Sequence, residues 1–167
     1  MQHLVPSARA NEIQRLVAAY REGAGSVRET GVEDALYAGA AEAIAALAAT
    51  DGLALGVATG KSHRGVLRMF DHNHWHQHFS TIQTADNNPS KPHPQMLIYL
   101  MDTLGVPPQR TLMIGDTTHD LQMARAAGVT GLAVSYGAHD EASLRALAPV
   151  ACVSSASELI AWLQTNA

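Results

Sequence analysis

Three short polar segments of this 167-residue chain have the residue types and the placement that a binding or catalytic site needs. Residues 59–61 (Thr-Gly-Lys) directly follow the apolar run 53–58, and residues 115–120 (Gly-Asp-Thr-Thr-His-Asp) directly follow the apolar run 111–114. Between them, residues 90–94 (Ser-Lys-Pro-His-Pro) open a predicted helix. Because ligands bind beyond the carboxyl ends of the strands in open α/β sheets, we expect these segments to meet at one site.

Residues 59–61 and residues 90–94 favour the binding of an anion. The hydroxyl of Thr59 beside the amide of Gly60 would stand at the start of a helix, where unpaired N–H groups and the helix dipole attract negative charge. Lys91 is fixed by the prolines that follow it and is therefore held more rigidly than an ordinary surface lysine. Taken alone, both patterns are weak, because most strand–Thr-Gly turns bind nothing and a solvated lysine before such a helix is common.

Residues 115–120 favour the binding of a divalent cation. Asp116 would lie at the tip of its strand and Asp120 about one helical turn beyond it, so both carboxylates can face one spot. Two hard oxygen ligands in a loop suit Mg²⁺, which keeps several waters and prefers carboxylate together with phosphate. The alternative is that Asp120 only caps or solubilises the start of the helix. This motif is considerably more specific than the other two.

Apolar runs and turn residues indicate the elements that must position these side chains. The predicted strands cover residues 53–58, 81–82, 111–114, 131–136 and 150–153; the predicted helices cover 36–50, 62–70, 92–104 and 118–127, with two more after 136 and 153. The third of these helices would hold its two prolines in the first turn, where a missing amide donor costs nothing. Strands that alternate with helices predict a parallel, doubly wound, Rossmann-like α/β sheet.

The first forty residues differ from this pattern. From Ile13 onward, apolar residues at i, i+3, i+4 and i+7 form one stripe of an amphipathic helix, and three glycines then interrupt it. We therefore expect residues 1–36 to form a separate helical segment and residues 37–167 to form the α/β core.

The bulk composition excludes several classes of partner. The chain is 47% hydrophobic and 16% charged, with a formal net charge of −4 and no basic stripe, so neither nucleic acid nor an anionic membrane is an expected partner. The longest nearly uninterrupted apolar stretch, residues 43–49, is far too short to span a bilayer. Cys152 is the single cysteine, which fits a reducing compartment. No secretion signal is evident, and the expected location is the cytoplasm.

In their order and spacing, the three segments resemble the haloacid dehalogenase (HAD) superfamily, in particular its subfamily IA and the phosphoglycolate-phosphatase-like branch. The matching stretches are LYAGAAEAI, LALGVATGKSHRG, SKPHPQML, TLMIGDTTHDLQMARAAGV and GLAVSYGAHD. The resemblance covers residues 36–164 well. It covers the first helices loosely and implies that residues 1–36 are the remnant of a helical cap at the N-terminus.

The resemblance implies a role for each candidate residue. Thr59 and the amide of Gly60 would hold the transferring phosphoryl group. Lys91 would neutralise phosphate and nucleophile charge. Asp116 would bind Mg²⁺, and Asp120 would be a second metal ligand or an acceptor beside the metal. Phosphoryl transfer needs positioning and charge stabilisation above all, which these roles supply.

The implied activity is Mg²⁺-dependent hydrolysis of a phosphomonoester of a small metabolite through an aspartyl-phosphate, with phosphoglycolate as the leading candidate substrate. A dehalogenase is a further possibility within the superfamily. Those enzymes work without metal, so the pair Asp116 and Asp120 counts against it. The substrate is set largely by the cap, so the sequence does not name it.

One expected motif is missing. In the family, the nucleophile and the general acid/base are two aspartates of a DxDxT motif on a strand before the cap, and no D-x-D occurs anywhere in this sequence. No substitute nucleophile is evident, since Cys152 lies on the last predicted strand, away from the three segments. The chain is therefore expected to be N-terminally truncated and inactive alone, because an aspartyl-phosphate cannot form without that carboxylate.

The missing strand would also be central in the sheet. Its loss would leave two apolar strand edges with unpaired backbone groups, which predicts marginal stability and self-association through those edges. Three explanations stay open. In the first, which we favour, Met1 is an internal methionine of a longer product. In the second, the chain is a catalytically inactive remnant that binds phosphate or a partner. In the third, a partner chain or a rearranged N-terminus fills the gap.

Residues 71–79 (Asp-His-Asn-His-Trp-His-Gln-His-Phe) offer a second possible metal site, because alternating imidazoles can bind a transition metal. The segment falls in a variable helix–strand connection of the family, where histidines are usually just solvated. We expect no metal there.

Overall fold

The computed structural model describes residues 35–166. The chain divides into two compact units, Met1–Ala35 and Leu36–Ala167, and the second of these carries all three candidate segments. The helical stripe predicted around residues 13–20 lies outside the described residues. The assignment of residues 1–36 to a cap remnant therefore stays a prediction.

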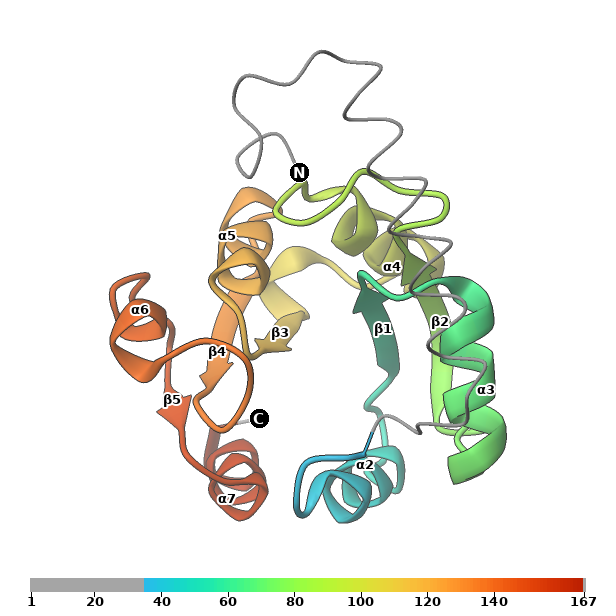
Figure 1. Ribbon diagram of the computed structural model, residues 1–167, viewed down its shortest axis with the longest axis horizontal. Helices are drawn as coiled ribbons and strands as arrows, with labels where there is room; N and C mark the ends of the chain where they lie inside the picture. The colour runs from blue at the N-terminus through green and yellow to red at the C-terminus, as the bar shows by residue number, and fades with distance from the viewer. Residues whose placement is uncertain (1–34, 167) are drawn as a thin grey trace. The chain divides into compact units, whose positions relative to one another are not determined.

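The described part of the second unit has five strands in two sheets, and the strands are parallel within each sheet (Figure 1). The first sheet pairs β1 (Leu55–Thr59) with β2 (Phe79–Thr84). The second has the order β3-β4-β5, with β3 at Leu112–Gly115, β4 at Thr130–Val134 and β5 at Cys152–Val153. Helices separate successive strands along the chain, so the predicted α/β fold with parallel strands is confirmed. The predicted strand positions were right to within about two residues, except that β2 is a full strand where only residues 81–82 were predicted.

The two sheets do not join through the described residues. Within residues 35–166, β1 pairs only with β2 and β3 pairs only with β4, so both strands have an open edge. Figure 1 shows that these are the edges that face each other. The sheet is thus interrupted between β1 and β3, where the family resemblance implies that a central strand is missing.

Within residues 35–166, six α-helices connect and flank the strands. They are α2 (Ala40–Ala48), α3 (His63–Asn73), α4 (Gln95–Leu104), α5 (Thr118–Ala126), α6 (Glu141–Arg145) and α7 (Ala156–Asn166), with a short 3₁₀ turn at Pro108–Arg110. No helix in this part of the chain is long and apolar enough to cross a membrane.

The prediction for the start of α4 was wrong in one detail. The helix begins at Gln95, after both prolines rather than around them, and Pro94 is the residue that caps it. The Lys91–Pro92 peptide bond is cis. The carbonyl of Pro94 accepts the first helical hydrogen bond, from Ile98, and this needs no amide hydrogen from proline.

The largest apolar cluster contacts strands of both sheets. Met96, Leu97, Leu100 and Met101 on α4 pack with Met123 and Ala124 on α5 and with Val129. Ala58 at the end of β1 and Met113 in β3 pack against the same cluster. Contact between α4 and α5 therefore sets where the residues before α4 lie relative to the start of α5, and these are the residues that carry Lys91 and Asp120.

The histidine-rich segment stays outside this core. His76 contacts Asp71 at 2.7 Å, and both side chains are more than half exposed. Phe70, Trp75 and Phe79 pack against one another as a separate aromatic cluster. No group of three or more His, Cys, Asp or Glu residues within 35–166 is arranged to hold a metal ion.

Candidate active site

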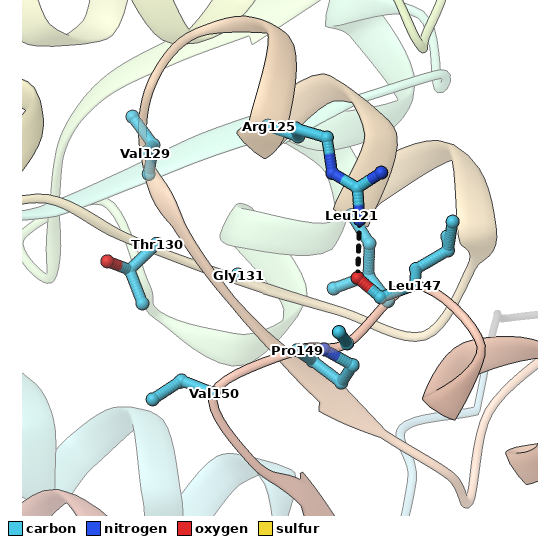
Figure 2. A pocket seen from close by; sticks show the side chains of 9 residues that line it. Leu121, Arg125, Val129, Thr130, Gly131, Leu147, Pro149 and Val150 are labelled. Atoms are coloured by element: carbon cyan, nitrogen blue, oxygen red, sulfur yellow. Dashed lines mark hydrogen bonds between the residues drawn. The ribbon is translucent and has the colours of Figure 1, made fainter.

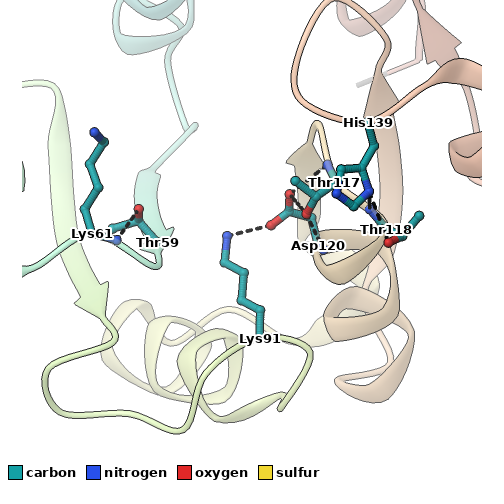
Figure 3. A network of polar contacts seen from close by, with 7 residues as sticks. All are labelled: Thr59, Lys61, Lys91, Thr117, Thr118, Asp120 and His139. Carbon is teal, nitrogen blue, oxygen red and sulfur yellow. Dashed lines mark hydrogen bonds and ion pairs between the residues drawn. The ribbon is translucent and has the colours of Figure 1, made fainter. Parts of the chain in front are cut away.

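A buried ion pair connects two of the three candidate segments (Figure 3). The ammonium of Lys91 donates to Oδ1 of Asp120 at 2.5 Å, with the two side chains only 19% and 4% exposed. Charges this far from water are costly unless they are paired and hydrogen-bonded. The pair therefore holds Lys91 in one direction, from the loop before α4 toward the start of α5.

The second oxygen of Asp120 is engaged by its own helix. Oδ2 accepts from the amide of Thr117 at 3.1 Å and from its hydroxyl at 2.7 Å, and the Thr117 hydroxyl accepts from the amide of Asp120 at 3.2 Å. This reciprocal capping box satisfies two orphan donors at the start of α5. Gly115 leaves room for it, since a Cβ there would lie 2.3 Å from Cβ of Asp120.

Asp116 is held from another direction, by the loop after β4. Its Oδ2 accepts from the amide of Ala138 at 2.9 Å, and its backbone carbonyl accepts from the amide of His139 at 3.1 Å. Gly137 lies so close that a Cβ there would approach Cβ of Asp116 to 2.2 Å. Burial raises the pKa of Tyr136, and the negative charge of Asp116 raises it further.

His139 is a part of this site that sequence reasoning missed. Its ring Nδ1 accepts from the amide of Thr118 at 3.1 Å and lies 3.2 Å from the Thr118 hydroxyl (Figure 3). The ring also makes an edge contact with His119, with centroids 5.9 Å apart. The only signal in the sequence was its place in the GAHD stretch just after a predicted strand.

The Thr59 segment stands apart from these contacts. Oγ1 of Thr59 accepts from the amide of Lys61 at 3.1 Å, and Ser62 caps α3 by accepting from the amide of Gly65 at 3.2 Å. A Cβ at Gly60 would meet nothing within 4 Å. Figure 3 shows Thr59 and Lys61 at the end of β1, on the other side of Lys91 from Asp120.

The structure thus joins the candidate residues in part. Lys91 and Asp120 are in direct contact, and Asp116 lies in the short loop between β3 and α5, just before the helix that carries Asp120. No hydrogen bond among the described residues joins Thr59 or Gly60 to the other three. The predicted convergence of all of them on one spot stays a prediction.

The two aspartates differ in their fitness to bind a metal. Both oxygens of Asp120 already have partners, so this residue fits the role of acceptor for Lys91 better than that of ligand. Asp116 has one carboxylate oxygen bound by the Ala138 amide, and its other oxygen has no hydrogen-bond partner within residues 35–166. A hard carboxylate oxygen of this kind is what Mg²⁺ takes as a ligand.

An open pocket lies away from these residues (Figure 2). It has a volume of about 290 Å³, and its lining includes Thr130 and Gly131 at the start of β4 and Val150 just before β5. The candidate residues follow the opposite, carboxyl ends of strands. Arg125 at its wall is tied to the carbonyl of Leu147 at 2.7 Å, so we assign no role in the chemistry to this pocket.

Cys152 offers no alternative nucleophile. It lies in β5 and packs beside the cluster of Leu121, Ala133 and Leu144. Burial raises the pKa of its thiol, and a thiol with a raised pKa carries little of the reactive thiolate.

Comparison with known proteins identifies the family. The chain belongs to the haloacid dehalogenase-like hydrolase family, whose sequence model matches residues 2–134. It is 34% identical over 154 residues to "Probable phosphatase IndB" of Dickeya dadantii, covering 89% of this chain and 66% of that protein. It is 33% identical over 114 residues to the phosphoglycolate phosphatase of Salmonella typhimurium, covering 68% of this chain and 44% of that enzyme.

Solved structures agree on the fold. A haloacid dehalogenase-like family hydrolase from Streptococcus pneumoniae matches with a TM-score of 0.78 at 22% identity, covering 96% of this chain and 74% of that one. A HAD-superfamily hydrolase of subfamily IA from Geobacter sulfurreducens matches with a TM-score of 0.59 at 27% identity, covering 84% and 72%. The predicted family and HAD-type fold are confirmed, and this chain spans only part of each relative.

Proposed function

We propose that this chain is the larger part of a phosphatase that hydrolyses a phosphomonoester of a small metabolite. The observation that carries the proposal is the buried Lys91–Asp120 pair next to Asp116, at the carboxyl end of β3, in a chain of this hydrolase family. A fixed ammonium beside an available carboxylate oxygen is an arrangement that can bind a phosphate ester together with a cation. Phosphoglycolate is the leading candidate substrate, because a relative bears that name.

Each residue then has a physical task. Thr59 and the Gly60 amide would donate hydrogen bonds to the phosphoryl oxygens, and Lys91 would offset their charge. Asp116 would hold Mg²⁺, which supplies charge neutralisation to the phosphate when bound. Asp120 would hold the ammonium of Lys91 in place through the hydrogen bond between them. In these roles the residues position the substrate and stabilise its charge, and none of them forms a covalent bond to the phosphoryl group.

The nucleophile belongs, in this proposal, to a longer form of the protein. Such a form would add a strand with a D-x-D motif between β1 and β3 and would react through an aspartyl-phosphate. The open edges of these two strands support a place for it. The 167-residue chain alone would then be inactive, because no D-x-D is present to provide the attacking carboxylate.

The second candidate is a binding protein that keeps the phosphate site without catalysis. The same missing motif favours it. Both candidates share a small phosphorylated ligand and a cytoplasmic location, which suits a single cysteine. Neither needs nucleic acid or a membrane, and both leave room for self-association through the open strand edges.

Two measurements separate the candidates. The first is the in-frame translation of the DNA upstream of Met1: an uninterrupted D-x-D-G-T favours the enzyme, and a stop codon favours the binding protein. The second is turnover of p-nitrophenyl phosphate and phosphoglycolate by the purified 167-residue chain and by a version extended upstream. We expect background rates from the former and Mg²⁺-dependent turnover, abolished by Asp116→Asn, from the latter. Turnover by the short chain that Asp116→Asn abolishes would show that another group attacks.

A further inference from the structure

The loop after β4 contacts Asp116 at both its side chain and its backbone. Ala138 donates its amide to Oδ2 of Asp116, and His139 donates its amide to the Asp116 carbonyl. Gly137 allows this close approach, because a side chain there would collide with the aspartate. Hydrogen bonds at two points of one residue restrict its rotation far more than either would alone.

The ring of His139 is the third point of attachment, and it reaches a different element. Its Nδ1 accepts the amide hydrogen of Thr118, the first residue of α5. Amides in the first turn of a helix have no partner within the helix, so this bond satisfies a donor that would otherwise need water. An Nδ1 that accepts carries no hydrogen, and the ring proton is then on Nε2.

We propose that His139 is a positioning residue. Its ring holds the 136–139 loop against the start of α5, a contact that we call the lock, and thereby fixes the direction in which Asp116 presents its unpaired oxygen. The inference rests on the proposed function in so far as that oxygen is to receive Mg²⁺. The lock itself is a property of the chain without metal.

The lock has a measurable consequence for the loop. Without the Nδ1 acceptor, only the backbone bond to the Asp116 carbonyl holds His139. The amide of Ala138 would then leave the Asp116 carboxylate more often and exchange its hydrogen faster. A net hydrogen bond contributes about 1 kcal/mol, so we expect roughly five- to tenfold faster exchange in this loop.

The experiment compares variants that separate the acceptor from the ring. His139→Phe keeps a ring and lacks the acceptor, whereas His139→Asn lacks the ring and offers a carbonyl oxygen to the Thr118 amide. His119→Ala is the matched control, because it removes the ring that touches His139 and none of the hydrogen bonds. Hydrogen exchange of the full chain without metal, read by mass spectrometry at low protein concentration, reports on peptides 136–140 and 117–120.

We expect faster exchange of both peptides in His139→Phe, near wild-type exchange in His139→Asn, and no change in His119→Ala. Equal exchange in the wild type and His139→Phe would overturn the proposal, as would equal acceleration in His119→Ala. Should Phe not be accommodated, His139→Ala lacks the acceptor as well and is judged against His139→Asn in the same way.

Binding of Mn²⁺, followed by its electron paramagnetic resonance signal, then connects the lock to the proposed function. Residues that orient metal ligands typically change metal affinity by about 10-fold, so His139→Phe should lose roughly that much and His139→Asn much less. A wild-type chain that binds no Mn²⁺ would contradict the metal role of Asp116, while the exchange result would still decide the lock. Equal Mn²⁺ affinity in the wild type and His139→Phe, with binding present, would refute the positioning role.

Discussion

The loop after β3 and the loop after β1 each follow the carboxyl end of a strand with an open edge, yet they are built differently. After β3, the side chains of Asp116 and Asp120 are held by partners from the loop before α4, from the loop after β4 and from α5 itself. After β1, Oγ1 of Thr59 accepts from the amide of Lys61, two residues further along the same loop. The aspartate side chains are thus held by distant parts of the chain, whereas the Thr59 side chain is bonded within its own loop. The distant contact at this end of β1 is made by a backbone amide, that of His63, which donates to Asp86 at 2.7 Å.

The glycines of the two loops show the same contrast. A Cβ at Gly115 or Gly137 would come within 2.3 Å of an aspartate side chain, whereas a Cβ at Gly60 would meet nothing within 4 Å. The carboxylate side is thus closely packed before any ligand arrives, and the Thr59 side has room beside a polar turn. In the proposed function, the first arrangement preorganises charge and the second receives the phosphoryl group.

The largest expected effect on stability comes from replacing Asp120 at the start of α5. Asp120→Ala removes the partner of a buried lysine together with the capping box of α5, and loss of one member of a buried pair costs about 3–5 kcal/mol of unfolding free energy. Urea unfolding followed by circular dichroism measures this loss.

Asp140→Ala is the matched control for that variant. Asp140 also caps a helix, accepting from the amide of Ser143, but it is exposed and has no lysine partner. Its loss should shift the urea midpoint far less. Similar shifts for both variants would mean that the Lys91–Asp120 pair adds little beyond an ordinary cap.

The next largest effect is expected from adding a methyl group at Gly137, and Gly60 is its comparison. Gly137→Ala forces Asp116 to move, and overpacking of this kind costs about 1–3 kcal/mol. Gly60→Ala adds a methyl group to open space, so its unfolding free energy should stay within about 0.5 kcal/mol of the wild type. The same urea titration checks both. A destabilising Gly60→Ala would show that the Thr59 loop is as tightly constrained as the other.

The strands and the candidate residues at their ends could be predicted because both depend on local pattern. Short apolar runs bounded by glycine predict buried strands, and polar residues directly after them predict a binding or catalytic site. Thr59, Lys91 and the two aspartates were found in this way. The exact start of α4 was not, because proline fits equally well just before a helix and inside its first turn.

The contacts that distinguish the two loops could not be predicted in the same way. Lys91 and Asp120 are 29 residues apart, and nothing near either one indicates that they pair. Asp120 looked equally suitable as a metal ligand because its partners depend on that folded contact. His139 follows a different strand from Thr118, 21 residues away, so its hydrogen bond has no local signature. The open edges of β1 and β3 were expected from the family resemblance, which implies a missing central strand; strand–helix alternation alone does not specify which strands become neighbours.

A small expected effect on stability, and the most specific test of the loop after β1, comes from Thr59→Val. The change keeps the shape of the side chain and removes the hydroxyl that accepts from Lys61 and that would donate to phosphate. A single neutral hydrogen bond contributes about 1 kcal/mol, so the unfolding free energy should fall by no more than that. Orthophosphate affinity, measured by calorimetry, should fall roughly fivefold for the same reason.

Thr84→Val controls for loss of a hydroxyl at a strand end. Thr84 pairs with Thr59 across the β1–β2 ladder, and its Oγ1 likewise accepts from an amide two residues further on, at 3.4 Å. It is buried and does not precede a Gly-Lys turn, so orthophosphate affinity should be unchanged in this variant. Thr59→Ser, which keeps a hydroxyl, should retain most of the wild-type affinity. If Thr59→Val and Thr84→Val weaken phosphate binding equally, the effect is a general loosening of the sheet, and the loop after β1 loses its assignment as the phosphate side of the site.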